Sequence, residues 1–188
     1  FAGYITINIS SPNTEGLRDF HDQGELKRLL TGLNKIINEK KIECPIVLKI
    51  SPDIKDDEIS KIVDLVSSHK IKGIVVSNTT DSNRDNLSDI KKHETGGISG
   101  QPLKDISKKL IKRFYKETKR KIKIIGVGGV DSGQSAYEKI TAGADAVQLY
   151  TGMVYKGPGI VKEIKKDLIS ILKKEKIKNI SEAVGINA

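Results

Sequence analysis

The stretch IIGVGGVDSGQSAYEKITAGADAVQLYTG, residues 124–152, places an apolar segment on either side of a helical pattern. Residues 122–127 and 145–150 are predicted to be strands, because they are apolar along their length, as is typical of strands buried on both faces. A helix is predicted between them, from about residue 133 to residue 142. The stretch therefore has the form of strand, helix and parallel strand, which is the repeating unit of α/β proteins.

The same unit recurs towards the N-terminus, where residues 4–9, 45–50 and 73–77 are also predicted to be strands. Apolar residues at helical spacing follow the strands and predict four further helices, which carry Leu26, Leu29, Leu30, Leu33, Ile36 and Ile37; Ile59, Ile62, Val63 and Val66; Ile106, Leu110, Ile111 and Phe114; and Val161, Ile164, Leu168, Ile171 and Leu172. Five βα units in succession predict a parallel sheet covered by helices.

Two architectures contain such units, an open doubly wound sheet and a (β/α)8 barrel. Polar or glycine-rich signals mark the end of every predicted strand: SSPNT, Lys49, SNTT, GVGGV and YTG. A barrel gathers the ends of all its strands around one mouth, whereas an open sheet uses mainly one switch point. We therefore predict a (β/α)8 TIM barrel, in which residues 1–188 form the C-terminal five βα units of a single domain.

Composition limits the class of protein. The 188 residues are 37% hydrophobic and 30% charged, which is typical of a soluble globular domain, and no apolar run approaches the roughly 20 residues that cross a membrane. The single cysteine, Cys44, excludes an internal disulfide and favours a reducing compartment, and the spacing of the three histidines predicts no metal site. The net charge of +9 comes from scattered lysines, which we interpret as solvated helix faces; nucleic acid is not a predicted partner.

The ends of the last two strands predict a site for a phosphate-bearing cofactor. Gly128 and Gly129 allow backbone N–H groups to approach a phosphate closely, and Thr151 adds a hydroxyl. Barrels commonly bind phosphate with the loops that follow their last two strands. Ser99 and Gly100, in the segment GGISGQPL, are expected to reach the same ligand. The alternative for each loop alone is an ordinary turn.

The first three strand ends carry groups that suit an anionic and planar ligand. Lys49 lies one residue from the end of an apolar strand, so we expect it to face an anionic cofactor ring or substrate, the alternative being a lysine that extends to the rim. Asn8, Asn13 and Asn78 offer amides that donate and accept hydrogen bonds, as a pyrimidine or another amide ring requires. By strand alternation, at most one of the two serines of SSPN faces the site. The alternative for this cluster is turn and helix-capping chemistry.

The motifs INISSPNTEGLR, VLKISPD, VSNTT, TGGISGQPL, IIGVGGVDSGQSAYEKITAGADAVQLYTG and EAVG resemble those of the dihydroorotate dehydrogenases, in the same order and over nearly the whole chain. The chain looks more like class 2, the quinone-linked type. Class 1 enzymes carry a cysteine where this sequence has Ser11, and the doubled threonine of NTT is also similar to class 2.

The resemblance implies a (β/α)8 barrel that holds FMN and oxidises (S)-dihydroorotate to orotate in pyrimidine biosynthesis, with hydride passing to FMN and electrons then to a quinone. Ser11 matches the catalytic base that removes the C5 proton. The residues that match positions holding the orotate ring are Asn8, Asn13, Asn78 and Thr79. The residues that match positions around FMN are Thr14, Lys49, Ser77, Ser99, Gly100, Gly128, Gly129, Tyr150 and Thr151, with Lys49 stabilising the anionic reduced flavin.

The same resemblance implies partners outside residues 1–188: the N-terminal part of the barrel, and an N-terminal helical pair through which class 2 enzymes meet the membrane and the quinone. It implies peripheral membrane association, on the cytoplasmic side in bacteria or on the mitochondrial inner membrane in eukaryotes. The family more often shows an arginine closer to the NTT threonines, so Arg84 receives no role. Residues 12–23 are expected to form a lid over the mouth, because they are polar and contain Gly16.

Two other functions remain open. One is another FMN barrel such as a tRNA dihydrouridine synthase, although that group uses a catalytic cysteine and Cys44 precedes the second strand. The other is a phosphate-binding half-barrel without catalytic activity.

Overall fold

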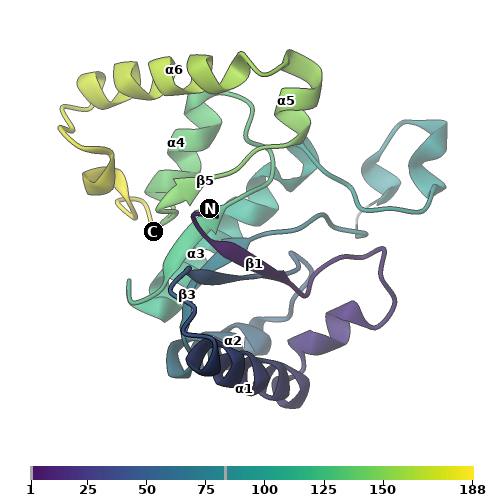
Figure 1. Ribbon diagram of the computed structural model, residues 1–188. Helices are drawn as coiled ribbons and strands as arrows, with labels where there is room; N and C mark the ends of the chain where they lie inside the picture. The colour runs from purple at the N-terminus through teal and green to yellow at the C-terminus, as the bar shows by residue number, and fades with distance from the viewer. Residues whose placement is uncertain (1, 83) are drawn as a thin grey trace.

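The computed structural model describes residues 2–82 and 84–188, and its centre is one sheet of five parallel strands in the order β1-β2-β3-β4-β5 (Figure 1). The strands are β1 Ile5–Asn8, β2 Ile46–Lys49, β3 Ile71–Val76, β4 Lys123–Gly126 and β5 Ala146–Val147. Each predicted strand is therefore present. A sheet in which neighbours in sequence are neighbours in space is the order found in a (β/α)8 barrel.

Helices follow the strands in turn and pack against one another along the outside of the sheet (Figure 1). They are α1 Gln23–Glu39, α2 Asp56–Ser68, α3 Lys104–Thr118, α4 Gly133–Thr141, α5 Thr151–Lys156 and α6 Ile160–Lys174. Short 3-10 helices lie in the connections: η1 Leu17–His21, η2 Arg84–Asn86, η3 Ile90–His93, η4 Gln101–Leu103 and η5 Ile180–Ala183. In Figure 1 the segment after β1, the long segment after β3 and α5 lie on the same side of the sheet.

Local sequence explains where α1 and α4 begin. Asp22 caps α1, since its carboxylate accepts hydrogen bonds from the N–H groups of Gly24 at 2.8 Å and Glu25 at 3.2 Å. Ser132 and Ser135 form a reciprocal capping box at the start of α4. These caps satisfy N–H groups that the first turn of a helix leaves unpaired.

Strand alternation separates the core into two layers. Leu48, Ile74 and Ile124 point outwards, where they form the main core with helix residues such as Phe114. Val47, Val75 and Ile125 point inwards and form a smaller cluster on the concave face. Since side chains two residues apart share a face, Lys49 and Ser77 extend from the concave face, beyond Val47 and Val75.

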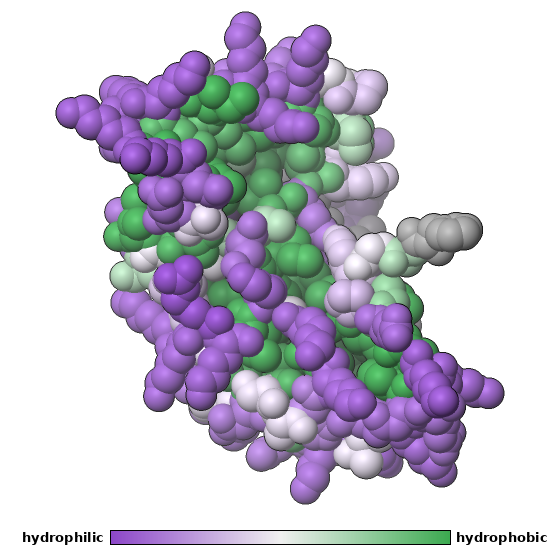
Figure 2. Space-filling view, turned by 60° about the vertical axis from the view of Figure 1, so that its left-hand side comes forward, coloured by the Kyte–Doolittle hydropathy of each residue, from purple (hydrophilic) through white to green (hydrophobic). Residues whose placement is uncertain are grey.

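The two edge strands, β1 and β5, differ from the expectation that the strands are buried on both faces, and Ala146 of β5 is exposed. Tyr4 and Ile5 each remain 41% exposed, because the described part of the chain places no strand on the outer edge of β1. The side chain of Tyr4 nevertheless accepts a hydrogen bond from Gln148, which follows β5, so the sheet curves enough to bring its two edges within reach of each other. Figure 2 shows hydrophobic residues gathered in a hollow across the middle of one face, between hydrophilic rims.

Two apolar residues of the predicted helices lie in those helices but remain partly outside the core. Val161 is 43% exposed, whereas Ile160 and Ile164 are buried against α4, because α6 begins at Ile160 and its inner face follows i, i+4 spacing. Ile36 is 50% exposed, since Leu30 and Ile37 already fill the inner face of α1. Within the described residues, no helix combines the length and the apolar character needed to cross a bilayer.

Candidate active site

A cavity of about 770 Å³ opens at the carboxyl ends of β2 to β5. Its lining includes all the predicted site residues except those on β1 and the loop that follows it, namely Lys49, Ser77, Asn78, Thr79, Ser99, Gly100, Gly128, Gly129, Tyr150 and Thr151. Its volume lies in the range of small-molecule and cofactor sites. The structure thus brings together residues as far apart in sequence as Lys49 and Thr151.

Glycine backbone forms one wall of this cavity. Gly128 has φ +106° and Gly129 has φ +68°, conformations that residues with side chains rarely adopt. A Cβ at Gly129 would lie 2.7 Å from Cβ of Lys104, and one at Gly100 would lie 3.0 Å from Cγ2 of Thr151. The close approach of these segments therefore leaves room only for hydrogen at these positions, and main-chain groups line the cavity.

The segments that form the cavity are joined by their own side chains. The hydroxyl of Thr151, at the start of α5, donates to the hydroxyl of Ser99 at 2.9 Å. The hydroxyl of Ser107 bonds to the carbonyl of Val127, which fixes the end of β4 against α3. The hydrogen bond between Thr151 and Ser99 keeps Thr151 next to Gly100, where a Cβ on the glycine would lie 3.0 Å from Cγ2 of Thr151.

Lys49 supplies positive charge to the cavity. Its side chain is about half buried, and this burial lowers the pKa of the ammonium group from its ordinary value. No carboxylate of residues 2–82 or 84–188 lies within ion-pair distance of it. A half-buried lysine without an acidic partner indicates that the cavity receives an anionic group.

A cluster of amides and a hydroxyl lies beside Lys49. Asn8 pairs with Lys49 in the β1–β2 register. The buried hydroxyl of Ser10 donates to Oδ1 of Asn8 at 2.7 Å and accepts from Nδ2 of Asn78 at 3.0 Å. Asn78 also bonds to the N–H of Thr79 at 2.8 Å. The first and third strand ends are thereby joined at the edge of the cavity.

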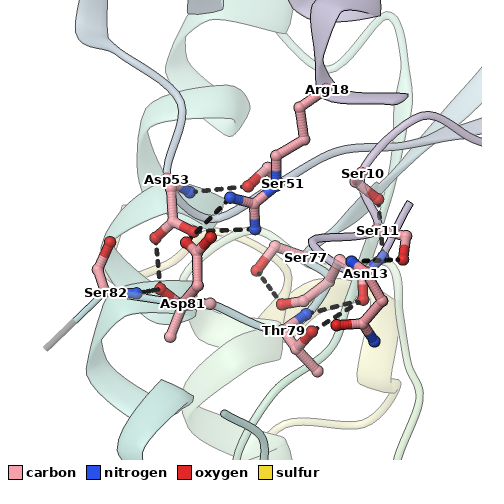
Figure 3. A network of polar contacts seen from close by, with 12 residues as sticks. Ser10, Ser11, Asn13, Arg18, Ser51, Asp53, Ser77, Thr79, Asp81 and Ser82 are labelled. Carbon is pink, nitrogen blue, oxygen red and sulfur yellow. Dashed lines mark hydrogen bonds and ion pairs between the residues drawn. The ribbon is translucent and has the colours of Figure 1, made fainter. Parts of the chain in front are cut away.

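Ser11, Asn13 and Thr14 lie on the loop after β1 and are not among the residues that line the cavity. Figure 3 shows Ser11 and Asn13 beside Thr79. The hydroxyl of Ser11 accepts a hydrogen bond from the N–H of Asn13 at 3.2 Å and is partly exposed. Gly97 lies between Thr79 and Pro12: a Cβ on this glycine would overlap the hydroxyl of Thr79 and lie 3.0 Å from Cγ of Pro12. The loop therefore reaches the rim of the cavity next to Thr79, and Thr14 is exposed.

Three loops of the mouth are tied together by Arg18, on η1 (Figure 3). Its guanidinium pairs with Asp53 at 3.2 Å and with Asp81 at 2.9 Å. Thr80 donates a further hydrogen bond to Asp53. Hydrogen bonding to Arg18 lowers the pKa of the Asp81 carboxyl below its usual value. The loops after β1, β2 and β3 are thus held by one arginine.

His21 reinforces this connection. Its Nε2 accepts the N–H of Ser51 at 3.2 Å, so the proton is on Nδ1, which lies 2.9 Å from the carbonyl of Arg18. Burial lowers the pKa of the imidazole, which keeps it neutral in this arrangement. The expected lid, residues 12–23, therefore divides into an exposed part, residues 12–16, and a part from Leu17 onwards that is anchored.

Arg84, which the sequence left without a role, holds the long segment after β3 in place. Its guanidinium donates to the carbonyls of Lys92 and Glu94, each at 2.9 Å, and to that of Gly96. At the base of the segment, Thr80 and Ile98 form an antiparallel bridge. This arrangement places Gly97 against Thr79, where a Cβ on Gly97 would overlap the threonine hydroxyl.

Several lining residues were not predicted from sequence. Gln148 follows β5, where a polar side chain in DAVQLY was the available signal. Asp131 accepts from the amide of Gln101, and its carbonyl accepts from Lys156 at 2.9 Å, which brings a second ammonium group to the cavity. Leu103, Val127, Val130 and Leu149 supply apolar wall. The apolar and charged residues of this set gave no signal in the sequence, because such residues are common throughout the chain.

The described residues contain no group of three His, Cys, Asp or Glu side chains arranged as metal ligands.

The fold and the cavity together define part of a parallel (β/α)8 barrel whose ligand site lies at the carboxyl ends of the strands. The sequence model of the dihydroorotate dehydrogenase family matches residues 1–172. The chain belongs to the dihydroorotate dehydrogenase family.

Individual relatives of this chain are dihydroorotate dehydrogenases as well. The dihydroorotate dehydrogenase (quinone) of Trichodesmium erythraeum is 44% identical over 97% of this chain and 50% of its own length. The mitochondrial dihydroorotate dehydrogenase (quinone) of Mus musculus is 41% identical over 99% of this chain and 48% of its own length. The crystal structure of ligand-free dihydroorotate dehydrogenase from Eimeria tenella superimposes with a TM-score of 0.93 at 36% identity, covering 99% of this chain and 56% of that one. The chain spans about half the length of the curated relatives it matches.

Proposed function

We propose that this chain is the C-terminal part, residues 1–188, of a single FMN-binding barrel that oxidises (S)-dihydroorotate to orotate and passes the electrons to a quinone. The observation that carries the proposal is one cavity that combines a glycine cradle and a half-buried lysine, with Asn78 in its lining and Asn8 linked to Asn78 at its edge. The family and the names of the relatives support the same activity.

The cavity fits FMN in size and in chemistry. Main chain at Gly128, Gly129 and Tyr150, with the hydroxyl of Thr151, forms the end suited to a phosphate, because N–H groups there can approach without a side chain intervening. Ser77, Ser99 and Gly100 line other parts of the same space, and Thr14 is proposed to reach it when the loop after β1 closes. When bound, FMN supplies the acceptor for the hydride that leaves C6 of the substrate.

Substrate is proposed to lie between Lys49 and the loop after β1. Asn8 and Asn78 are held side by side by Ser10 and present amides to the ring, and Thr79 lies next to Asn78. Asn13, on the loop, completes the set when the loop closes. An amide pair of fixed spacing suits the alternating donors and acceptors of a pyrimidine ring.

Ser11 is proposed to remove the C5 proton as general base. Its hydroxyl is partly exposed and, among the described residues, accepts a hydrogen bond from the N–H of Asn13 and donates none, which leaves its proton available to be donated onwards. A serine hydroxyl holds its proton tightly at neutral pH, so it needs a route for that proton. A water held near Thr14 is the proposed route.

Lys49 is proposed to stabilise negative charge in the cavity. Its partial burial strengthens electrostatic interactions with a bound anion, because the local dielectric is lower than that of water. The partners proposed outside the chain are the N-terminal part of the barrel and the quinone. Peripheral association with a membrane through an N-terminal segment is the corresponding proposal for location.

The test uses the complete enzyme that contains this chain. Purified protein should show a flavin absorption spectrum that dihydroorotate bleaches under anaerobic conditions and that a short-chain quinone restores. A protein that binds flavin but reduces it only with NADPH and modifies tRNA would be a dihydrouridine synthase instead. A protein that binds phosphate compounds without any flavin reduction would be a non-catalytic barrel. Either result would overturn the proposal.

A further inference from the structure

One lysine departs from the expectation that lysines lie on solvated helix faces. Lys139, on α4, is 1% exposed and belongs with the largest fully buried side chains of the described residues. Its Nζ donates a hydrogen bond to the carbonyl of Lys104 at 3.2 Å. A buried ammonium group without a carboxylate partner is strongly unfavourable unless it serves a ligand or a structural need.

The sheet makes room for this side chain. Gly126 is the last residue of β4, and its outward side is occupied by its neighbours: a Cβ there would lie 3.3 Å from Cδ of Lys139 and 3.1 Å from Cβ of Ala144. The lysine therefore runs along the outer surface of β4 towards the carboxyl end of the strand. This is the end at which the cavity opens.

The ammonium group ends directly behind the glycine wall of the cavity. Lys104, whose carbonyl it contacts, is the first residue of α3, and N, Cα and Cβ of Lys104 form the contact surface for Gly129. Lys139 thus lies one residue layer away from the backbone that lines the cavity. Water has no access to it from the outside.

The neighbouring carboxylates are engaged elsewhere. Glu138 pairs with Lys104 at 3.3 Å and Lys108 at 3.5 Å, and Asp105 pairs with Lys108 at 3.3 Å. Among the described residues, no ion pair includes Lys139. The charged groups of α3 and α4 that face Lys139 are therefore two lysines and two acids that already pair with each other, which leaves its charge uncompensated.

We propose that Lys139 is a positioning residue: it places a buried positive charge behind the glycine wall and holds the backbone of Lys104 by a hydrogen bond. Through this charge, Lys139 selects a phosphorylated flavin over an unphosphorylated one. The inference rests on the proposed function, since it takes the ligand to be FMN. Lys139 itself is not among the residues that line the cavity. The bound dianion would compensate the charge that the protein leaves unpaired.

Proton linkage gives this arrangement a measurable signature. Burial lowers the pKa of Lys139 to about 8. A phosphate dianion nearby favours the charged form and raises that pKa, so FMN binds more tightly when Lys139 carries its proton. As the pH rises through 8, affinity for FMN should fall, by at most about tenfold per pH unit. Riboflavin has no phosphate, so its affinity should not show this dependence.

The experiment measures dissociation constants of FMN and riboflavin for the flavin-free complete enzyme between pH 7 and 9.5, a range in which the FMN phosphate stays largely dianionic. The variant is Lys139→Met, which keeps an unbranched side chain of similar length, one atom shorter, and removes the charge. Lys109→Met, on the exposed face of α3, is the control for loss of one charge. At pH 7.5 we expect Lys139→Met to weaken FMN at least tenfold and riboflavin less than threefold, and to abolish the pH dependence of the FMN to riboflavin ratio. Lys109→Met should behave as the parent.

Thermal stability of the flavin-free protein separates this role from ordinary packing. A lysine whose pKa is lowered on folding disfavours the folded state below pH 8, and the penalty is relieved as the pH rises from 8 towards the unfolded value. Flavin-free Lys139→Met should therefore melt at a higher temperature than the parent at pH 7. Equal weakening of FMN and riboflavin, or no change in either, would overturn the inference.

The parent protein alone keeps the inference testable if the variant does not fold, because a FMN to riboflavin ratio that is constant from pH 7 to 9.5 would also overturn it. A parent that binds neither flavin would instead contradict the proposed function.

Discussion

The hydroxyl of Ser10 accepts a hydrogen bond from the amide of Asn78 at 3.0 Å, although the two residues lie 68 positions apart in sequence. Ser10 also donates to Asn8, so one buried hydroxyl fixes the spacing of two amides at the rim of the cavity. Among the described residues, the Ser11 hydroxyl makes no hydrogen bond to this cluster; it accepts one from the N–H of Asn13 and is partly exposed. The two adjacent serines therefore have separable roles.

Replacement of Ser11 by Ala should slow flavin reduction by dihydroorotate about 10²- to 10⁴-fold, the usual contribution of a general base. Flavin content and reoxidation by quinone should stay near the parent values, since neither step uses the hydroxyl. Stopped-flow absorbance under anaerobic conditions measures the reduction step, and the parent rate should rise with pH as the hydroxyl loses its proton more easily. Ser60→Ala, on the exposed side of α2, is the matched control. Parent-like reduction by Ser11→Ala would remove Ser11 from the mechanism.

Replacement of Ser10 by Ala should act on substrate binding. Without the hydroxyl, Asn8 and Asn78 lose the group that spaces them, and the partly buried amide of Asn78 loses a partner. We expect KM for dihydroorotate and Kd for orotate to rise about tenfold, with a smaller effect on the rate of flavin reduction at saturation. A variant with unchanged orotate affinity would show that the cluster has no part in recognition.

Replacement of Gly129 by Ala should release the cofactor. The added Cβ would lie 2.7 Å from Cβ of Lys104, and φ +68° is unfavourable for alanine, so the loop must move away from its present path. Flavin content, measured from absorbance after gel filtration, should fall to a small fraction of the parent value. Gly32→Ala is the control, because it lies in α1 with nothing within 4 Å of the added atom. Full flavin content in Gly129→Ala would exclude this loop as the phosphate site.

Limited proteolysis should distinguish the two parts of the loop after β1. We expect cleavage of the parent within residues 12–16, reduced when orotate is bound, and protection from Leu17 onwards. Arg18→Gln removes the cation between Asp53 and Asp81, so cleavage should extend into η1. Because Arg18 lowers the pKa of Asp81, this anchoring is present above about pH 4 and is lost as the pH falls through the folded pKa, so it should be constant from pH 6 to 8. Equal cleavage with and without orotate would contradict a lid.

Residues 1–188 expressed alone should neither bind FMN nor turn over. The chain has an exposed edge strand, with Tyr4 and Ile5 both 41% exposed, and β5 is only two residues long. Such edges favour aggregation. Gel filtration and absorbance measure both properties, and co-expression with the N-terminal half of a relative serves as the positive control. Flavin binding and turnover by the isolated chain would contradict the interpretation that it is part of a larger barrel.

Much of the fold follows from sequence because each strand is a short apolar run that ends in a polar signal. The predicted strands over residues 45–50 and 122–127 agree with β2 and β4 to within one residue at each end. The predicted strand over residues 145–150 is reduced to Ala146 and Val147, since it has a neighbour on one side only. Pairing with a neighbour, which local sequence does not contain, decides how far an edge strand extends.

The cavity was predictable where backbone chemistry is unusual, as at Gly128 and Gly129, and where a lysine ends an apolar strand, as at Lys49. Contacts between charged residues that are distant in sequence could not be predicted. Arg18 meets Asp53 and Asp81, which lie 35 and 63 positions away, and nothing in its own neighbourhood separates it from a solvated arginine. Lys139 also resembles a surface lysine in sequence. Its burial follows only from the space left by Gly126.

The way Arg84 closes its own loop bears on how the protein tolerates change in length. Arg84 collects the carbonyls of Lys92, Glu94 and Gly96, and the bridge between Thr80 and Ile98 closes the base of the same excursion. Among the described residues, none between Thr80 and Ile98 lines the cavity. Insertions or deletions among residues 85–91 should therefore leave the site intact, so that natural relatives can differ there in length and a foreign peptide, such as an epitope for immobilisation, can be accommodated between Leu87 and Ser88.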